Sequence, residues 1–408
     1  MNLPQIKLSF LQLQTIILVL IGILFLLLGL PSLYKRISWC DGYALGDWII
    51  NYEDGGFKRR GLSGSFFILT SEITGIYIGK LVFTFITALY VLFVVQCVLF
   101  FRKIKLDFSL VVLILIPTSL FFPINDLYAF GRKEILLFNI FLFFLIIRDK
   151  YNIYSWKYIL LFSFLISVST LFHELIVFYV PYIMLIYWID YKLKVKETLF
   201  KIGVIGLSSF IPALLIFLFG KDVNEGRSWE IFKSLGVSSN VMNGIFSWPK
   251  EGFGKGQVNA LIFAKSRHYY LYFVSYLVTI ISFCFLFIKN RWLGFSSSKV
   301  IFTHMLLLFL SIPIFFLTID WGRWLNIHFI CSLFFILAYY LKNDNRKFVT
   351  LQQSLTNIKI DSIVKSFIFI FIIFGFTMFH VDIGFQLGQN GFLTSIRDLF
   401  WQIRHLIF

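Results

Sequence analysis

Six groups of ionisable side chains stand beside apolar segments, and each contains residue types that serve in proton transfer or anion binding. The groups are Asp41, Asp47, Asp54, Arg59 and Arg60; Arg132; His173 and Glu174; Arg227; Asp320 and Arg323; and His380 with Asp382. Carboxylates and imidazoles can take a proton from an attacking hydroxyl, and a guanidinium offers a planar fork of donors to phosphate oxygens. The combination is typical of an active site that handles an anionic substrate.

The composition requires a membrane environment for these groups. Apolar residues make up 59% of the 408 residues and charged residues only 14%, and the mean hydropathy is +0.83. A soluble domain is about a quarter charged. The net charge is +16. The basic residues recur beside apolar segments, as membrane topology requires, and therefore do not indicate nucleic-acid binding.

The apolar segments predict an all-α, polytopic membrane protein with a single integral membrane domain over residues 1–408. Because a span needs about 20 apolar residues, we expect about 11 transmembrane helices. The segments are 12–31, 76–101, 108–122, 134–148, 156–173, 175–190, 199–219, 268–288, 300–318, 324–341 and 363–380. Short helices are expected in two long outer segments, 32–75 and 220–267, and an amphipathic interfacial helix at 383–408.

Lysine and arginine in the short loops set the orientation. Basic clusters fall in alternate loops, at 102–105, 148–150, 192–196, 289–291 and 342–347. These loops are therefore predicted to be cytoplasmic, with the N-terminus on the same side. All six ionisable groups then lie on the opposite, outer face.

The first outer segment supplies the densest set of carboxylates, and one of Asp41, Asp47 and Asp54 is the expected general base. Arg59 and Arg60 follow as anion-binding candidates, and the second outer segment adds Arg227 as another. The alternative for these residues is a solvated, mixed-charge loop.

The helix-end motifs each carry a functional and a structural interpretation. Arg132 follows a glycine at a helix start, where it binds an anion or merely flanks the membrane. His173 and Glu174 occupy a tight hairpin, as an acid/base pair or as a packed, hydrogen-bonded histidine.

The Asp320-Trp321-Gly322-Arg323-Trp324 motif offers an anion-binding arginine and indoles that could stack on sugar rings, with His328 about one turn deeper. An Asp–Arg ion pair with interfacial tryptophans is the alternative.

Residues 131–185 resemble the central signature of polysaccharide polymerases of the Wzy and EpsG type. The matching residues are Arg132, His173 and Pro181, together with an acidic first outer loop and a late arginine, Arg323. The DGGFKRRGL and DWGRWL blocks depart from the usual EpsG pattern. The resemblance also extends to lipid-phosphate-dependent membrane glycosyltransferases of the GT-C type.

The resemblance implies polymerisation of undecaprenyl-pyrophosphate-linked oligosaccharide repeat units at the periplasmic face of a bacterial inner membrane. It implies partners as well: the lipid-linked oligosaccharide, membrane lipid, a chain-length regulator and a flippase. No cofactor is expected, and metal dependence is left open. The alternatives are a lipid-linked oligosaccharide flippase and a transferase that uses a polyprenyl-phosphate sugar. A flippase should spread its charges along a central cavity.

The predicted topology can be tested by labelling single cysteines in intact cells. Cysteines placed in the loops around residues 54, 132, 174, 240 and 321 should react with an impermeant reagent, because every short basic loop falls on the other side. Labelling of positions 193 or 344 from outside, with position 321 protected, would overturn this architecture.

Overall fold

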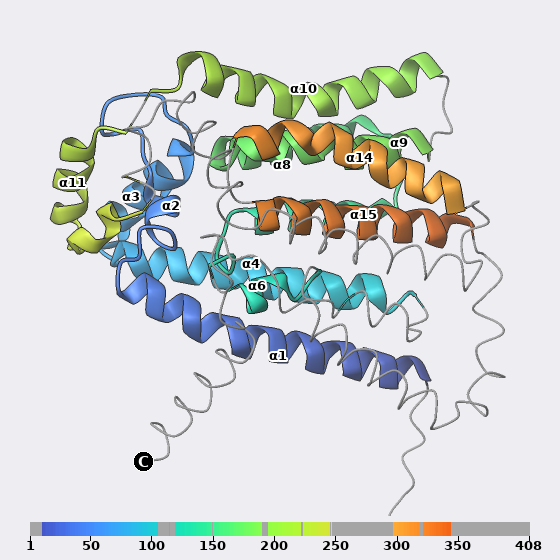
Figure 1. Ribbon diagram of the computed structural model, residues 1–408, viewed down its shortest axis with the longest axis horizontal. Coiled ribbons are helices and arrows are strands. Elements are labelled where there is room, and N and C mark those ends of the chain that lie inside the picture. The colour runs from blue at the N-terminus through green and yellow to red at the C-terminus, as the bar shows by residue number, and fades with distance from the viewer. Residues whose placement is uncertain are drawn as a thin grey trace, which may run out of the picture.

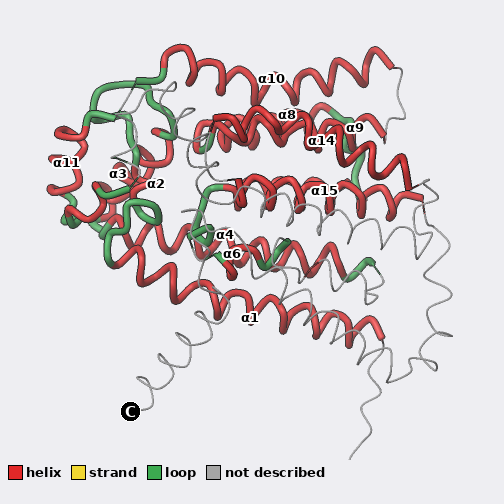
Figure 2. Tube along the Cα trace, in the orientation of Figure 1, coloured by secondary structure: helices red, strands yellow, loops and turns green. Residues whose placement is uncertain are grey.

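The computed structural model describes residues 10–104, 114, 119–126, 128–148, 150–189, 195–221, 223–244, 246, 297–317 and 321–343. These residues form twelve α-helices and two 3-10 helices (Figure 2). Within them, β pairing is limited to an isolated bridge between Lys58 and Lys221. The predicted all-α class is confirmed for the described part of the chain.

Among the described residues, three helices are long and apolar enough to cross a membrane: α1 (Phe10–Ser38), α4 (Ile78–Phe101) and α10 (Val195–Phe219). Their outward faces are apolar: Leu20 on α1 is 59% exposed and Phe217 on α10 is 70% exposed. Water would oppose such a surface, whereas lipid tails accept it. The three helices and their apolar outer faces therefore indicate a membrane protein.

Five further predicted segments coincide with shorter helices. These are α7 (Glu134–Arg148), α8 (Trp156–Phe172), α9 (Val180–Ile189), α14 (Ser297–Leu317) and α15 (Trp321–Asn343). The predicted segments 268–288 and 363–380, most of 108–122, and the tail 383–408 lie outside the described residues.

The first outer segment contains the short helices that the sequence predicted, and the first long helix extends into it. Helix α1 continues to Ser38, past Pro31 and the predicted end at residue 31. Two further helices follow, α2 (Gly46–Ile49) and α3 (Gly61–Thr74). Gly64 lets them pack directly, because its amide donates to the Ile50 carbonyl at 3.0 Å and a Cβ there would lie 2.0 Å from that oxygen.

The hairpin after α8 is tight, as its sequence predicted. His173 has an extended backbone (φ −153°, ψ 100°) that ends α8, and the 3-10 helix η1 (Glu174–Tyr179) leads straight into α9. Pro181 stands in the first turn of α9, where its missing N–H costs no helical hydrogen bond. The chain therefore reverses with His173 and Glu174 at the junction.

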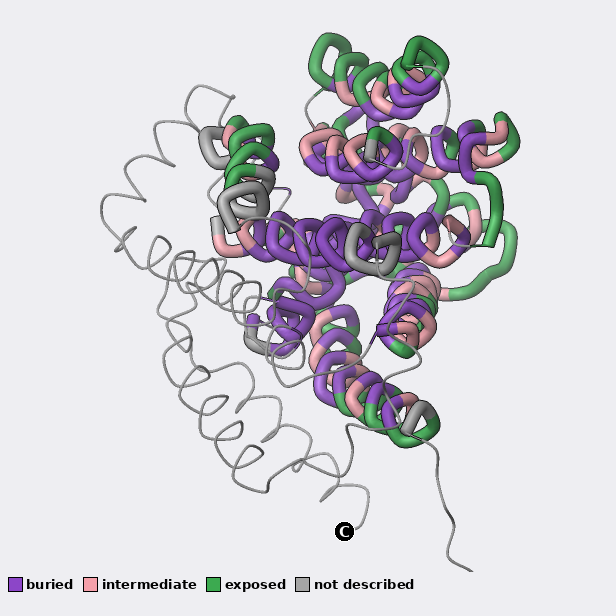
Figure 3. The backbone as a smooth tube through the Cα atoms, turned by 90° about the vertical axis from the view of Figure 1, so that its right-hand side faces the viewer, coloured by how far each residue is buried: buried purple, intermediate pink, exposed green. Residues whose placement is uncertain are grey.

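One end of the bundle gathers the short elements (Figure 1). There α2 and α3 lie beside α11 (Glu225–Ser234), close to the ends of α1 and α10. The 3-10 helix η2 (Ser239–Met242) packs on α11, whereas α6 (Phe122–Asn125) lies farther along the bundle, beside α1. Buried residues fill the interior between the helices, and exposed residues mark the outer helices (Figure 3).

Candidate functional site

Asp47, in the four-residue helix α2, lies at the centre of a buried charged network. Its Oδ1 accepts a hydrogen bond from Arg60 Nη1 at 2.8 Å. Arg132 Nη1 lies 3.8 Å from Oδ2, and Lys133 Nζ lies 4.0 Å from Oδ1. Asp47 is 1% exposed, and all three cations are also buried. A single carboxylate thus joins cations from the start of α3 and from the start of α7.

The pKa values of this group follow from burial and neighbouring charge. Burial alone would raise the pKa of Asp47, but the charges of Lys133, Arg60 and Arg132 outweigh it and hold that pKa well below its usual range. Burial lowers the pKa of Lys133 to about 8, against the opposing attraction of Asp47. Asp47 is therefore a fixed anion that compensates buried cations, and a weak proton acceptor.

Gly131 and Trp48 position the start of α7. Gly131 has a φ of +93°, a conformation that favours glycine. Its amide donates to the Tyr90 hydroxyl at 3.0 Å, and its carbonyl accepts from Trp48 Nε1 at 2.7 Å. Lys133 Nζ donates to Ser63 Oγ at 2.8 Å. The turn before α7 is thereby fixed to both α4 and the first outer segment.

His173 connects two carboxylates. Its Nε2 lies 3.3 Å from Glu134 Oε1, and its Nδ1 lies 3.8 Å from Glu174 Oε2. The side chain is 1% exposed, and its Nδ1 has no hydrogen-bond partner within the described residues. Glu134 also pairs with Arg323. The imidazole is thus oriented by Glu134 on one side and faces a second carboxylate on the other.

Glu174 carries the network to the molecular surface. Its carboxylate pairs with Arg59 and lies 3.3 Å from Arg60 Nε, so Arg60 bridges Glu174 and Asp47. Burial alone would raise the pKa of Glu174, but Arg59 and Arg60 hold it well below its usual range. The Arg59 side chain is 46% exposed. Solvent therefore reaches the network at the Arg59 end.

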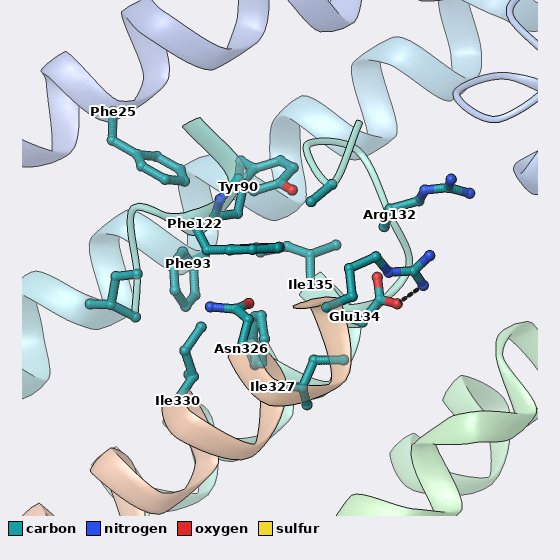
Figure 4. A pocket seen from close by; sticks show the side chains of 15 residues that line it. Phe25, Tyr90, Phe93, Phe122, Arg132, Glu134, Ile135, Asn326, Ile327 and Ile330 are labelled. Atoms are coloured by element: carbon teal, nitrogen blue, oxygen red, sulfur yellow. Dashed lines mark hydrogen bonds and ion pairs between the residues drawn. The ribbon is translucent and has the colours of Figure 1, made fainter. Parts of the chain in front are cut away.

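A pocket adjoins the buried end of the network. Arg132, Glu134 and Arg323 line it together with Asn326, and its enclosed volume is about 20 Å³, room for about one water molecule. The other lining residues are Phe25, Tyr90, Phe93, Leu120, Phe122, Pro123, Ala129, Ile135, Phe138, Ile327 and Ile330. Figure 4 shows Arg132 and Glu134 on one side, with Phe25 and Phe93 on the other. The pocket therefore has one charged end and one apolar end.

Trp324 and His328 are buried, so neither offers a surface on which a sugar ring could stack. Trp324 is 1% exposed; it lies under the Arg323 guanidinium at 4.8 Å and edge-on to His173 at 6.4 Å. Tyr179 donates to its carbonyl at 3.2 Å. His328 hydrogen-bonds the Tyr182 hydroxyl inside the bundle. As placed here, both residues support neighbouring side chains.

Several predicted site residues have other surroundings. Asp41 pairs with Arg36 at 2.9 Å and accepts from the amides of Tyr43 and Ala44, which closes the turn after α1. Arg227 is exposed on α11. Asp320 lies outside the described residues, as does the side chain of Trp321.

Asp54 connects the two outer segments through an ion pair and two hydrogen bonds. It pairs with Lys58 at 2.7 Å and accepts from Ser228 Oγ at 2.5 Å and from the Asn224 amide at 3.1 Å. Asp54 and Lys58 are both almost fully buried. These bonds hold α11 against the first outer segment, and Asp54 thus has a structural setting apart from the Asp47 network.

Sequence reasoning assigned no role to Lys133 and Glu134, which the structure places inside the network. Both belong to the Arg132-Lys133-Glu134 tripeptide, whose position after a glycine was the available signal. Interfacial charges usually snorkel to water. Only the tertiary structure, which places Lys133 beside Ser63 of α3, shows that Lys133 is fully buried.

We predict that Asp47→Asn lowers stability as well as activity. The change leaves three buried cations without their shared anion, a loss that typically costs about 3–5 kcal/mol. Thermal unfolding of the purified protein should show a clear drop in Tm. Glu53→Gln is the matched control, because Glu53 is exposed and bonds only Ser65 Oγ at 2.8 Å among the contacts described. An unchanged Tm for Asp47→Asn would contradict the compensating role.

Comparison with known proteins adds no relative to this geometry. No protein-family model matches the chain, and no curated protein or solved structure is significantly similar to it. The chemistry of the site is therefore argued from its own residues. Within the described residues, no group of three or more His, Cys, Asp or Glu side chains is arranged to hold a metal ion.

Proposed function

We propose that this protein is a glycosyltransferase that polymerises undecaprenyl-pyrophosphate-linked oligosaccharide repeat units at the periplasmic face of a bacterial inner membrane. The observation that carries the proposal is the convergence of Arg132, His173 and Arg323 in one buried network beside an apolar pocket. The identity of the substrate rests on the resemblance of residues 131–185 to Wzy and EpsG polymerases. The proposed topology has eleven spans and a cytoplasmic N-terminus.

Arg132 and Arg323 are proposed to hold the pyrophosphate of the donor lipid. Both residues border the pocket. Negative charge develops on the leaving pyrophosphate as the glycosidic bond breaks, and pre-positioned cations stabilise that charge without reorganising. Arg59 and Arg60, at the solvent-reached end, are proposed to contact the incoming phosphate or sugar.

His173 is our candidate for the base that deprotonates the acceptor hydroxyl. The pKa values of Asp47 and Glu174 are held well below their usual range by the arginines around them, which makes both poor proton acceptors. His173 is held at Nε2 by Glu134, and its Nδ1 faces the Glu174 side. A base oriented by a carboxylate is a recurrent arrangement in transfer to hydroxyls.

A lipid-linked oligosaccharide flippase is the alternative from another class. It should carry ionisable groups along a central path through the bundle. In the described residues the network joins α2, α3, η1 and the starts of α7 and α15, which favours an enzyme. A transferase using a polyprenyl-phosphate sugar is the second alternative. Loss of a polymerase leaves one repeat unit on the lipid, whereas loss of a flippase removes surface glycan.

Arg132→Ala and Arg323→Ala should each abolish chain extension in a deletion strain, with single repeat units still delivered to the lipid. Arg→Lys should rescue poorly, because an ammonium lacks the planar fork. The measurement is the glycan ladder on a gel at matched protein level. Arg102→Ala is the control and should give a normal ladder, since Arg102 is exposed at the C-terminal end of α4, outside the network. Normal ladders in both alanine variants would remove the phosphate role.

His173→Gln should lower kcat by about 10²–10⁴-fold with a much smaller change in KM, because general base catalysis acts on the transition state. Glu134→Gln should lower kcat less, since it orients the imidazole without taking the proton. Purified variants are assayed with lipid-linked repeat unit, and their Tm values are compared with wild type. Wild-type kcat in a folded His173→Gln variant would exclude His173 as the base.

A further inference from the structure

Helix α3 presents an apolar stripe that faces away from the rest of the described chain. Phe66 is 48% exposed, Leu69 56% and Ile73 75%. At about 3.6 residues per turn, these three side chains and Leu62 fall within about 60° of the helix circumference. The opposite side of the helix, which includes Gly64, is buried. One narrow face of α3 is therefore both apolar and exposed.

The polar groups of α3 are arranged as an interfacial helix requires. Thr70 Oγ1 donates to the Phe66 carbonyl at 2.7 Å, and Thr74 Oγ1 donates to the Thr70 carbonyl at 2.6 Å. Both hydroxyls are thus satisfied by the helix itself and need no water. Glu72 is exposed at one edge, about 90° from the centre of the stripe. An apolar face bordered by a charged edge is typical of a helix that lies in a membrane interface.

The neighbouring helix α4 sets the level of the membrane. Lys80 near its start and Arg102 directly after its end are both exposed. They are 22 residues apart, which is about 33 Å at about 1.5 Å per residue and matches a hydrocarbon core about 30 Å thick. The rings of Phe66 and Phe85 lie 6.4 Å apart. Because Phe85 is five residues past Lys80, about 7.5 Å along α4, Phe66 lies at the level of the hydrocarbon core.

The start of α3 is held at the end of a second apolar helix, α10. The Lys221 amide donates to the Phe57 carbonyl at 2.9 Å, beside the bridge between Lys58 and Lys221. Phe219, the last residue of α10, is 63% exposed, and Lys221 is exposed two residues later. Figure 1 shows α3 at the end of the bundle where α10 ends and α4 begins. Both ends of α3 therefore lie where long apolar helices leave the membrane.

We propose that α3 is a membrane-interface helix whose apolar stripe lies among the lipid chains of the leaflet at the network end of the bundle. Lipid suits the stripe because the contact of Phe66 with Phe85 makes it continuous with the apolar outer face of α4, where Val95 is 48% exposed. The buried side of α3 contacts the charged network, since Ser63 accepts a hydrogen bond from Lys133. Helix α3 thus separates the buried charges from the lipid.

Depth measurements on the full chain in phosphatidylethanolamine–phosphatidylglycerol nanodiscs test this assignment. Because the protein has four cysteines, a nitroxide is attached instead to a ketone-bearing amino acid at position 69 or 73. Molecular oxygen, which concentrates among lipid chains, should relax both labels more than a water-soluble nickel chelate does, as it should at position 95. A label at position 233, exposed on α11, should show the reverse order.

Two results of the depth measurement would overturn the proposal. Stronger relaxation by nickel at positions 69 and 73 would place the stripe in water. Weak relaxation by both reagents at these positions would mean that protein, such as a second copy of the chain, covers the stripe instead of lipid.

A pair of substitutions on α3 gives an independent measurement. Leu69→Asp places a carboxylate among lipid chains and should lower the Tm in nanodiscs, whereas the same change on a water-exposed surface is nearly neutral. Glu72→Lys, three residues along on the charged edge, is the matched control and should keep the wild-type Tm. An unchanged Tm for Leu69→Asp would contradict the lipid contact. Neither measurement depends on glycosyl transfer, so the proposed function and the placement of α3 can fail separately.

Discussion

The structure depends on the compensation of buried charge. Asp47 sits on a helix of only four residues, yet it neutralises cations from two other parts of the chain. A buried ion is costly unless it is paired and hydrogen-bonded. Because Arg60, Arg132 and Lys133 share this anion, the first outer segment and the start of α7 have to lie together.

The same constraint extends through two more carboxylates. Arg60 bridges Asp47 and Glu174, while Glu134 joins His173 to Arg323. Each of these charged groups pairs with more than one neighbour. The network therefore connects α3, η1, α7 and α15 at one end of the bundle. Glu174 and Arg59 are the members nearest to solvent. A charged substrate can reach them without crossing the apolar interior, which suits the proposed transfer reaction.

Aromatic and glycine residues hold this polar end in place. Tyr90 and Phe130 stack at 4.1 Å with nearly parallel rings, and the hydroxyl of Tyr90 accepts the amide of Gly131. Trp48 binds the carbonyl of the same glycine. The backbone before α7 is therefore fixed from both sides, which directs Arg132 toward Asp47 and Lys133 toward Ser63. The aromatic framework thus supplies rigidity close to the charges.

The sequence alone determined the helical membrane class, eight of the segments that coincide with described helices, and the membership of most of the network. Apolar run length and the types of flanking charge carry that information, because both are local properties of the chain. Arg60, Arg132, His173 and Arg323 stood out for this reason, and the structure brings them into one network.

Tertiary structure alone decided how the charges are paired. Asp41, Asp47 and Asp54 look equivalent in sequence, but packing gives each a different partner. Asp41 pairs with Arg36, Asp47 pairs with the buried cations, and Asp54 accepts a hydrogen bond from Ser228. Lys133 looks like an ordinary flanking charge in sequence, but the structure buries it between Ser63 and Asp47. Burial and partner distance set the protonation and the role of an ionisable group, and both depend on residues far away in the chain.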